Sequence, residues 1–335
     1  MPPIRLPRRT LLLSTALLLA ACAGGLPAPK PWHETATREL HLSLAAFEVQ
    51  GRRVNVTRSA GAPATQPVVV YLPGLGQGPD AGQRWATAWA QAGYTVLAVQ
   101  PLEADAAAWR SELSRTGEFR ELGLLHYGDA LRTERLEALR RLVPALRAAQ
   151  PQLDWTRAAL AGYETGAQTV LDARADAPWQ AVVAISPPAM RAPASGAATL
   201  LVTSETDGDP LNLVRRPAER LQAFDAFEPG SGWLLKLPIA SHAALAGTLA
   251  PEGWHAQDQH RGQGGPAVMP GRGRGGVGGE GLHGPAGGGA RGPRSGSATE
   301  ASQADLDDAF RFSSSFLDAR LRGGAMPVSA ALTAR

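Results

Sequence analysis

The segment that decides the fold reads RAALAGYETGAQTV, from Arg157 to Val170. It begins with an apolar run of strand length, continues through a turn flanked by Gly162 and Gly166, and ends in a helical pattern. Two glycines around one central residue allow a strained turn that lifts the central side chain above a sheet, beside the first amides of the following helix. The segment therefore predicts that Glu164 stands at the apex of a strand–turn–helix unit.

The rest of the chain repeats this alternation of strand and helix, which is typical of a mainly parallel sheet with helices on both faces. The expected strands are 67–72, 94–99, 158–161, 181–185, 199–203 and 233–237, preceded by a hairpin of 38–44 and 53–57. The expected helices are 81–92, a long helix within 121–149, 165–173, 218–227 and 302–321. The predicted fold class is α/β, with the active site at the carboxyl ends of the strands.

The composition excludes several classes of protein. Of 335 residues, 44% are hydrophobic and 19% are charged, so the chain can bury a substantial core. The formal net charge is +3 and the only lysines are Lys30 and Lys236, which argues against a nucleic-acid binder with a concentrated basic face. A single cysteine excludes an intrachain disulfide and a thiolate-rich metal site.

The N-terminus has the pattern of an export signal. Arg5, Arg8 and Arg9 precede an apolar run that is too short to span a bilayer. The residues Leu19–Cys22 (LAAC) resemble the lipobox of bacterial lipoproteins, in which the cysteine is acylated. This resemblance implies a lipid anchor at Cys22 and a periplasm-facing place in the cell envelope, with the outer membrane favoured because alanine, not aspartate, follows the cysteine. The alternative is an ordinary cleavable signal.

These patterns divide the chain into six segments. We expect a signal peptide at 1–21, a flexible spacer at 22–36, an α/β domain at 37–255, a disordered insertion at 256–301, a helix at 302–322 that docks on the same domain, and a tail at 323–335. Glycine, arginine and proline dominate 261–297, so that stretch lacks the apolar side chains needed for a core. Arginine–glycine runs can also contact RNA or anionic surfaces, but an exported protein rarely meets RNA.

The turn around Glu164 resembles the nucleophile elbow of the α/β-hydrolase family, particularly its dienelactone-hydrolase and lipase-like branches. The loop 73–78, which follows the strand PVVVYL, is similar to the oxyanion loop of that family. The resemblance implies an α/β-hydrolase fold, in which the amides of Leu75 and Thr165 would form the oxyanion hole.

Two further motifs follow in the chain order of that family. Asp207 comes after the expected strand 199–203 and matches the acid of the catalytic triad, with Asp209 as the alternative. His242 comes after the expected strand 233–237 and matches the triad histidine. The resemblance therefore implies Glu164, Asp207 and His242 as the catalytic residues.

Glutamate at position 164, where most of the family has serine, leaves several interpretations open. Some members open carbon–halogen bonds or epoxides with an aspartate nucleophile, and glutamate would move that carboxylate by roughly 1.5 Å. Alternatively, the Glu164 carboxylate fills the oxyanion site at the helix N-terminus and pairs with His242, which leaves a noncatalytic protein. A third interpretation is a displaced nucleophile, either Ser186 or Ser241.

The sequence thus predicts a lipid-anchored hydrolase of small esters or related electrophiles, with an inactive binding or structural envelope protein as the alternative. It holds no phosphate loop, metal cluster or nucleotide fingerprint, so no cofactor or metal is expected. His126, His255 and His260 lack ligand spacing and are expected to be solvated surface residues. A small molecule and the membrane are the expected partners and nucleic acid is not, while the substrate and the oligomeric state stay open.

Overall fold

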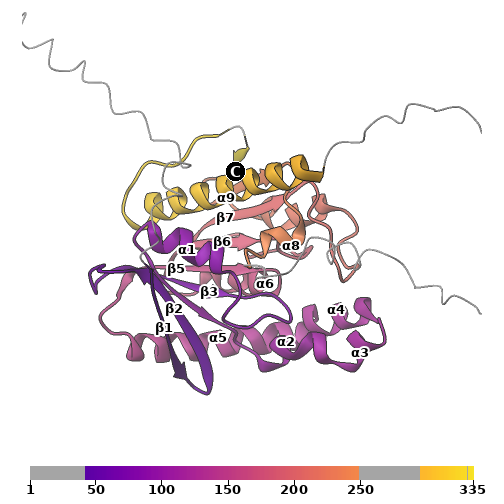
Figure 1. Ribbon diagram of the computed structural model, residues 1–335, viewed down its shortest axis with the longest axis horizontal. Coiled ribbons are helices and arrows are strands. Elements are labelled where there is room, and N and C mark those ends of the chain that lie inside the picture. Colours follow the sequence, from indigo (N-terminus) through magenta and orange to yellow (C-terminus); the bar gives the residue numbers. More distant parts are fainter. Residues whose placement is uncertain (1–41, 249–294, 330) are drawn as a thin grey trace, which may run out of the picture. The chain divides into compact units, whose positions relative to one another are not determined.

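The computed structural model describes residues 42–248, 295–329 and 331–335 (Figure 1). These residues include a nine-stranded sheet in the order β1-β2-β4-β3-β5-β6-β7-β8-β9. Neighbours from β4 to β8 in this order run parallel, whereas β1, β2 and β9 pair antiparallel. The strands are β1 (Leu42–Val49), β2 (Arg52–Ser59), β3 (Pro67–Leu72), β4 (Thr95–Val99), β5 (Asp154–Tyr163), β6 (Trp179–Ile185), β7 (Ala198–Ser204), β8 (Gly232–Leu237) and β9 (Leu332–Ala334). The predicted α/β fold with a mainly parallel sheet is confirmed.

Helices connect most of these strands. The α-helices are α1 (Gln83–Gln91), α2 (Glu103–Ala107), α3 (Glu112–Arg115), α4 (Phe119–Tyr127), α5 (Asp129–Ala149), α6 (Thr165–Asp172), α7 (Gln222–Asp225), α8 (His242–Leu245) and α9 (Ser295–Leu321). The short 3₁₀ helices are η2 (Ala108–Arg110), η3 (Ala173–Ala175) and η4 (Pro217–Leu221). Within the described residues, no helix combines the length and the apolarity that crossing a bilayer requires.

The sheet is covered on both faces. Its central strands are buried at nearly every position, so their side chains alternate between two separate apolar layers. One layer joins the sheet to α1 and α9, where the rings of Trp85 and Phe310 pack edge to face with centroids 4.7 Å apart. The other layer joins the sheet to α5 and α6, with Leu139 and Leu142 among its members. In Figure 1, α1 and α9 accordingly lie above the strands and α5 below them.

Several elements differ from the sequence prediction. The long helix expected within 121–149 is present as α5, but the residues before it form a separate helix, α4, because the extended backbone of Gly128 (φ −66°, ψ 158°) lies between the two. The helix expected at 218–227 is instead the 3₁₀ helix η4 followed by the short α7. Helix α9 begins at Ser295, ahead of the predicted residue 302, and the segment expected as a tail contributes β9.

Some predictions lie outside the described residues. They include the signal peptide, the lipidation site Cys22, the spacer, the insertion up to residue 294, and the histidines His255 and His260. The hairpin predicted from 38–44 and 53–57 is described from residue 42 onward, as β1 and β2 joined at Gln50 and Gly51.

Candidate active site

Glu164 is the single residue between β5 and α6, and its backbone is strained. Its φ of 54° and ψ of −110° lie in a region of backbone conformation that residues other than glycine rarely adopt. The two flanking glycines make this turn sterically possible. A Cβ on Gly162 would lie 2.5 Å from the carbonyl of Gly166, and a Cβ on Gly166 would lie 2.1 Å from the carbonyl oxygen of Leu72. The predicted sharp turn is therefore present, with Glu164 at its apex.

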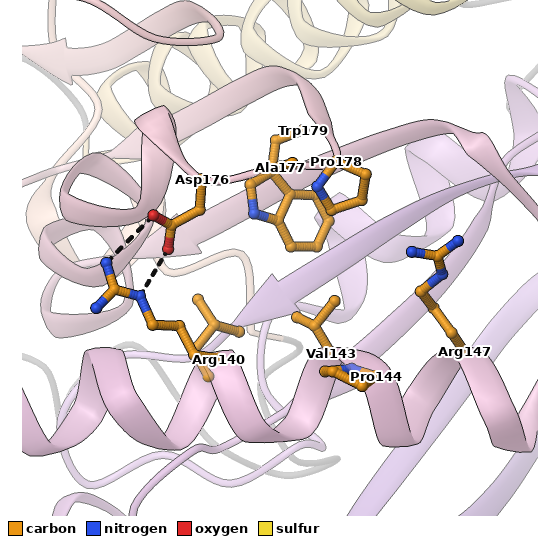
Figure 2. A pocket seen from close by; sticks show the side chains of 9 residues that line it. Arg140, Val143, Pro144, Arg147, Asp176, Ala177, Pro178 and Trp179 are labelled. Atoms are coloured by element: carbon orange, nitrogen blue, oxygen red, sulfur yellow. Dashed lines mark hydrogen bonds and ion pairs between the residues drawn. The ribbon is translucent and has the colours of Figure 1, made fainter.

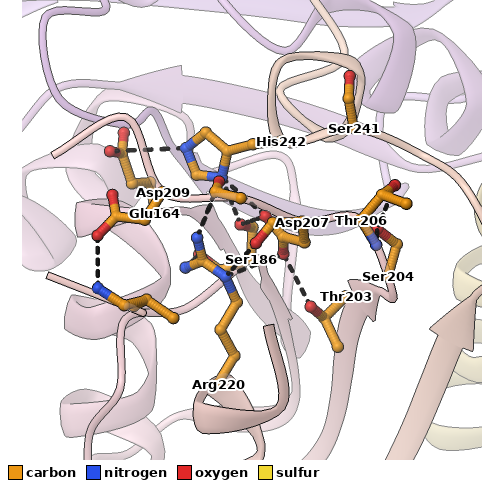
Figure 3. A network of polar contacts seen from close by, with 12 residues as sticks. Glu164, Ser186, Thr203, Ser204, Thr206, Asp207, Asp209, Arg220, Ser241 and His242 are labelled. Carbon is orange, nitrogen blue, oxygen red and sulfur yellow. Dashed lines mark hydrogen bonds and ion pairs between the residues drawn. The ribbon is translucent and has the colours of Figure 1, made fainter. Parts of the chain in front are cut away.

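The two oxygens of the Glu164 carboxylate have different surroundings. The residue as a whole is buried, with 4% of its surface exposed. Oε2 accepts a hydrogen bond of 3.0 Å from the amide of Leu75. Oε1 lies 3.8 Å from Nε2 of His242, and no described residue donates a hydrogen bond to it (Figure 3). One oxygen is thus anchored by a hydrogen bond, while the other faces the imidazole without one.

The loop that carries Leu75 follows β3 and is held from the segment after β4. The carbonyl of Leu75 accepts a hydrogen bond of 3.0 Å from the indole of Trp109, and the amide of Gly76 donates one of 2.7 Å to the carbonyl of Asp105. Thr165 is the first residue of α6, but its amide makes no hydrogen bond to the Glu164 carboxylate among the described contacts. Of the two expected oxyanion donors, only the Leu75 amide is engaged by Glu164.

Asp207 lies just beyond the end of β7 and is fully buried. Its Oδ1 accepts hydrogen bonds of 2.8 Å from Nδ1 of His242 and from the hydroxyl of Ser186, and its Oδ2 accepts one of 2.8 Å from Thr203. Nε of Arg220 lies 3.2 Å from Oδ2. Burial opposes ionisation, but the His242 hydrogen bond and the Arg220 charge hold the pKa of Asp207 below its usual value. Asp207 is therefore an ionised partner of His242.

His242 stands between the two carboxylates, at the first position of α8, whose N-cap is Ser241. The ring of Tyr163 lies beside it, with centroids 5.2 Å apart. Burial disfavours the charged imidazole, but the hydrogen bond to Asp207 and the negative charges of Asp207 and Glu164 outweigh that effect and raise the pKa of His242 to about 9. At neutral pH the resting site therefore contains an imidazolium.

The alternative site residues occupy supporting positions. The carboxylate of Asp209 accepts hydrogen bonds from three amides of the loop 211–214, so it orders that loop. The hydroxyl of Ser186 lies 2.9 Å from Nδ1 of His242, the nitrogen that faces Asp207, which is the wrong side for a nucleophile. Ser241 caps α8 and points away from the network (Figure 3).

Tyr127 is a site residue that the sequence analysis missed. Burial, followed by the charge of Glu164, raises the pKa of this phenol well above its usual value. The side chain also packs against an apolar cluster that contains Leu75, Leu122 and Leu211. Tyr127 is the last residue of α4, a helix that the sequence analysis did not predict.

The expectation that His126 is a surface residue is wrong. Its side chain is 5% exposed, and Nδ1 lies 2.8 Å from Oδ1 of the fully buried Asp105. Arg135 completes the cluster, with Nε 2.6 Å from Oδ2 of Asp105 and a further hydrogen bond to Gln168 on α6. The cluster fixes α2, α4 and α5 to the helix that follows Glu164, and its carboxylate and guanidinium satisfy each other.

A separate groove of about 460 Å³ lies between α5 and the start of β6 (Figure 2). Val143, Pro144 and Trp179 form its apolar walls, and Arg140 pairs with Asp176 across one end. Because Glu164 lies at the opposite end of the parallel strands, this groove does not belong to the candidate site. Within the described part of the chain, no group of three or more His, Cys, Asp or Glu residues is placed to hold a metal ion.

No protein-family model matches the chain, and no curated protein matches it. Among solved structures, it is similar to a dienelactone hydrolase from Anabaena variabilis, with 21% identity, a TM-score of 0.41, and coverage of 66% of this chain and 95% of that chain. It is also similar to a protein from Xanthomonas campestris described as a member of the α/β serine hydrolases without a lid, with 18% identity, a TM-score of 0.41, and coverage of 60% and 86%. These similarities concern the fold alone.

Proposed function

We propose that the protein hydrolyses small electrophilic substrates, with Glu164 as a carboxylate nucleophile. The observation that carries the proposal is the unequal pair of oxygens on Glu164: Oε2 is anchored by the Leu75 amide, and Oε1 has no hydrogen-bond donor. A carboxylate oxygen without a hydrogen-bond donor is more nucleophilic than one that accepts a hydrogen bond, because the hydrogen bond stabilises the anion. The apolar cluster around Leu75 and Tyr127 favours apolar substrates.

In the first step, Oε1 of Glu164 attacks a saturated carbon of the substrate. A carbon–oxygen bond forms, and the bond to the leaving group breaks with departure of its electron pair. The enzyme now carries an ester on Glu164 whose carbonyl oxygen is Oε2. Members of the α/β-hydrolase family that open carbon–halogen bonds or epoxides use aspartate in this way, which makes alkyl halides and epoxides the first compounds to test.

Before the second step, His242 gives up its proton, to the leaving group where this is an alkoxide and otherwise to solvent. Neutral His242 then removes a proton from water, and the water oxygen attacks Cδ of the Glu164 ester. The negative charge then develops on Oε2, where the Leu75 amide already donates a hydrogen bond. Collapse expels the product alkoxide, which takes the proton from His242. The carboxylic acid left on Glu164 passes its proton to His242 and restores the resting ion pair. Asp207 orients the imidazole throughout through its 2.8 Å bond to Nδ1.

The raised pKa of His242 suits this order of events. An imidazolium cannot activate a serine or a water molecule, so a resting pKa of about 9 disfavours a serine-type mechanism at neutral pH. The Glu164 charge is one cause of that high pKa, and ester formation removes this charge. His242 therefore becomes a base at the step that needs one.

Single-turnover hydrolysis in ¹⁸O-labelled water tests the proposal. Protein in excess is incubated with haloalkanes, epoxides and small esters, and the peptide that contains Glu164 is analysed by mass spectrometry. We expect a covalent adduct at early times and the ¹⁸O label in the Glu164 carboxylate afterwards. Label found only in the product, or no turnover of any compound, would contradict a carboxylate nucleophile.

A noncatalytic ligand-binding protein is the second candidate, and one observation favours it. Because Oε2 of Glu164 occupies the Leu75 amide, an ester substrate cannot use that donor for its own oxyanion. On this interpretation Glu164→Ser frees the amide and creates esterase activity toward p-nitrophenyl acetate in a protein that had none. The carboxylate-nucleophile proposal instead expects wild-type turnover that Glu164→Gln abolishes.

For its location, we propose a lipid anchor at Cys22 and a place at the periplasmic side of the envelope. The support is the LAAC pattern that ends the apolar run of the N-terminus. A tethered enzyme would act on small molecules that reach the periplasm.

A further inference from the structure

Arg220 is a buried guanidinium that touches both the acid and the histidine of the site. The residue is 2% exposed and lies on η4. Its Nε lies 3.2 Å from Oδ2 of Asp207, and one terminal nitrogen lies 3.4 Å from Nδ1 of His242. Its terminal nitrogens also donate to three main-chain carbonyls, those of Ser186, Pro187 and Gly208. The guanidinium is therefore held in one place and its charge is fixed there.

Arg220, Asp207, His242 and Glu164 form a chain of neighbouring charged side chains. Glu164 and Asp207 are anions, Arg220 is a permanent cation, and His242 is the only member that changes charge readily near neutral pH. With His242 protonated the four charges sum to zero. Burying an uncompensated charge is costly, so the group as a whole favours the protonation state that keeps the sum at zero.

We propose that Arg220 is a positioning residue that couples the protonation of His242 to the charge on Glu164. The proposal rests on the proposed function. When Glu164 becomes an ester, its negative charge disappears, and Asp207 is still neutralised by Arg220. The zero sum then requires neutral His242, which is the form that activates water.

Without Arg220 the same count gives the opposite result. In the ester state Asp207 alone would face His242, so the imidazolium would persist as its partner and could not remove a proton from water. Arg220 thus keeps His242 neutral, and therefore basic, while Glu164 carries the ester. An ordinary structural arginine would brace the loop and leave the protonation of His242 unchanged.

The other polar groups around His242 do not alter this count. The phenol of Tyr163 donates to the carbonyl of His242, and burial raises its pKa well above the usual value, so it stays neutral. Burial raises the pKa of Tyr127 in the same way, so Tyr127 also stays neutral. Asp209 is committed to backbone amides of the loop 211–214, and the hydroxyl of Ser186 donates to Asp207.

The first test measures the pKa of His242 by NMR, without any substrate. Glu164→Gln removes the charge that esterification removes, and we expect it to lower the pKa of His242 by roughly two units. Arg220→Met added to that variant should raise the pKa again by at least about one unit. Equal values for Glu164→Gln with and without Arg220→Met would overturn the proposal.

Two variants separate charge from architecture. Arg220→Lys keeps the cation while losing the planar fork, so the pKa of His242 should stay near that of the wild type. Arg174 is a second buried guanidinium, 1% exposed, which donates to carbonyls of Pro193, Ala194 and Ala197 far from His242. Arg174→Met should reduce stability without moving the His242 pKa, and a shift of equal size there would assign the Arg220 effect to loosening of the fold.

The second test follows the reaction. With a substrate that labels Glu164 in the wild type, Arg220→Met should form the ester and hydrolyse it slowly, so that adduct accumulates at neutral pH and declines as the pH rises. Unchanged hydrolysis of the adduct would refute the coupling. If no compound forms a covalent adduct on Glu164 of the wild-type protein, the proposed function fails. The NMR comparison still decides whether Arg220 controls the protonation of His242.

Discussion

The indole of Trp109 occupies the space that a side chain at Gly76 would need. A Cβ at position 76 would lie 1.6 Å from Cδ1 of Trp109, and Gly76 has a φ of +72°. The same indole donates to the carbonyl of Leu75, the residue whose amide binds Glu164. The position of the loop 73–78, which holds the Leu75 amide against Glu164, thus depends on the absence of one methyl group at Gly76.

Gly76→Ala should therefore lower the free energy of unfolding by about 2–4 kcal/mol, because both the positive φ and the clash with Trp109 must be relieved. Gly78→Ala is the matched control, since nothing lies within 4 Å of a Cβ at that position. It should change stability by less than about 0.5 kcal/mol. Urea denaturation of both variants measures the difference, and equal losses would contradict the assigned clash.

The charged state of His242 predicts how stability depends on pH. Its folded pKa of about 9 exceeds the unfolded value of 6.5, so its contribution is fully present below pH 6.5 and is lost as the pH rises through 9. The loss is on the order of 3 kcal/mol. Urea denaturation between pH 6 and pH 9.5 measures it, and His242→Gln should flatten the curve in that window. A wild-type curve that is already flat there would count against the imidazolium.

The buried pair of Asp105 and Arg135 predicts a large effect from removing one charge. Asp105→Asn leaves a guanidinium that is 1% exposed without its partner, so stability should fall by about 3–5 kcal/mol. Asp308→Asn breaks an exposed pair with Arg311 and should cost less than about 1 kcal/mol. Thermal and urea unfolding check both, and comparable losses would mean that burial does not govern these pairs.

Shortening the side chain of the proposed nucleophile, Glu164, should separate the effect of its position from that of its charge. Glu164→Asp keeps the carboxylate but withdraws it by roughly 1.5 Å, away from the Leu75 amide and from His242. Turnover of any compound that labels the wild type should fall on the order of 100-fold, because a misplacement of about 1 Å already has that effect. Stability should change little compared with Gly76→Ala. Undiminished activity would show that the Leu75 contact does not position the nucleophile.

The lipobox pattern predicts membrane association through Cys22. Wild-type protein expressed in a Gram-negative host should partition into detergent and incorporate a labelled fatty acid. Cys22→Ala should remain soluble after export and carry no label. A labelled Cys22→Ala protein, or an unlabelled wild type, would contradict the anchor.

Local patterns in the sequence predicted the elements whose conformation is decided locally. The spacing of Gly162 and Gly166 around Glu164 predicted a turn that only glycines permit at those two positions. Uninterrupted apolar runs predicted strands that are buried on both faces of the sheet. The parallel arrangement then brought the residues after β5, β7 and β8 to one edge of the sheet. For these reasons Glu164, Asp207 and His242 could be expected near one another, although the sequence carried no measure of which oxygen faces which atom.

Features that depend on distant partners could not be predicted in this way. The leucine periodicity that predicted α5 begins at Leu131, so it gave no sign of α4 or of the position of Tyr127 near Glu164. His126 and Arg135 resemble surface residues until Asp105 arrives from another helix. Arg220 likewise gave no local signal, because its importance comes from the carboxylate and the imidazole that the fold places beside it.

The carboxylate of Asp305 on α9 accepts hydrogen bonds from the amides of Ile239 and Ala240, just before His242. The loop that carries the imidazole is therefore fastened to the last helix through space, in addition to its connection along the backbone. The stretch that joins α8 to α9 in the sequence need not transmit any of this alignment. A change in the number of residues between α8 and α9 would leave this contact, and with it the position of the imidazole relative to Asp207, in place.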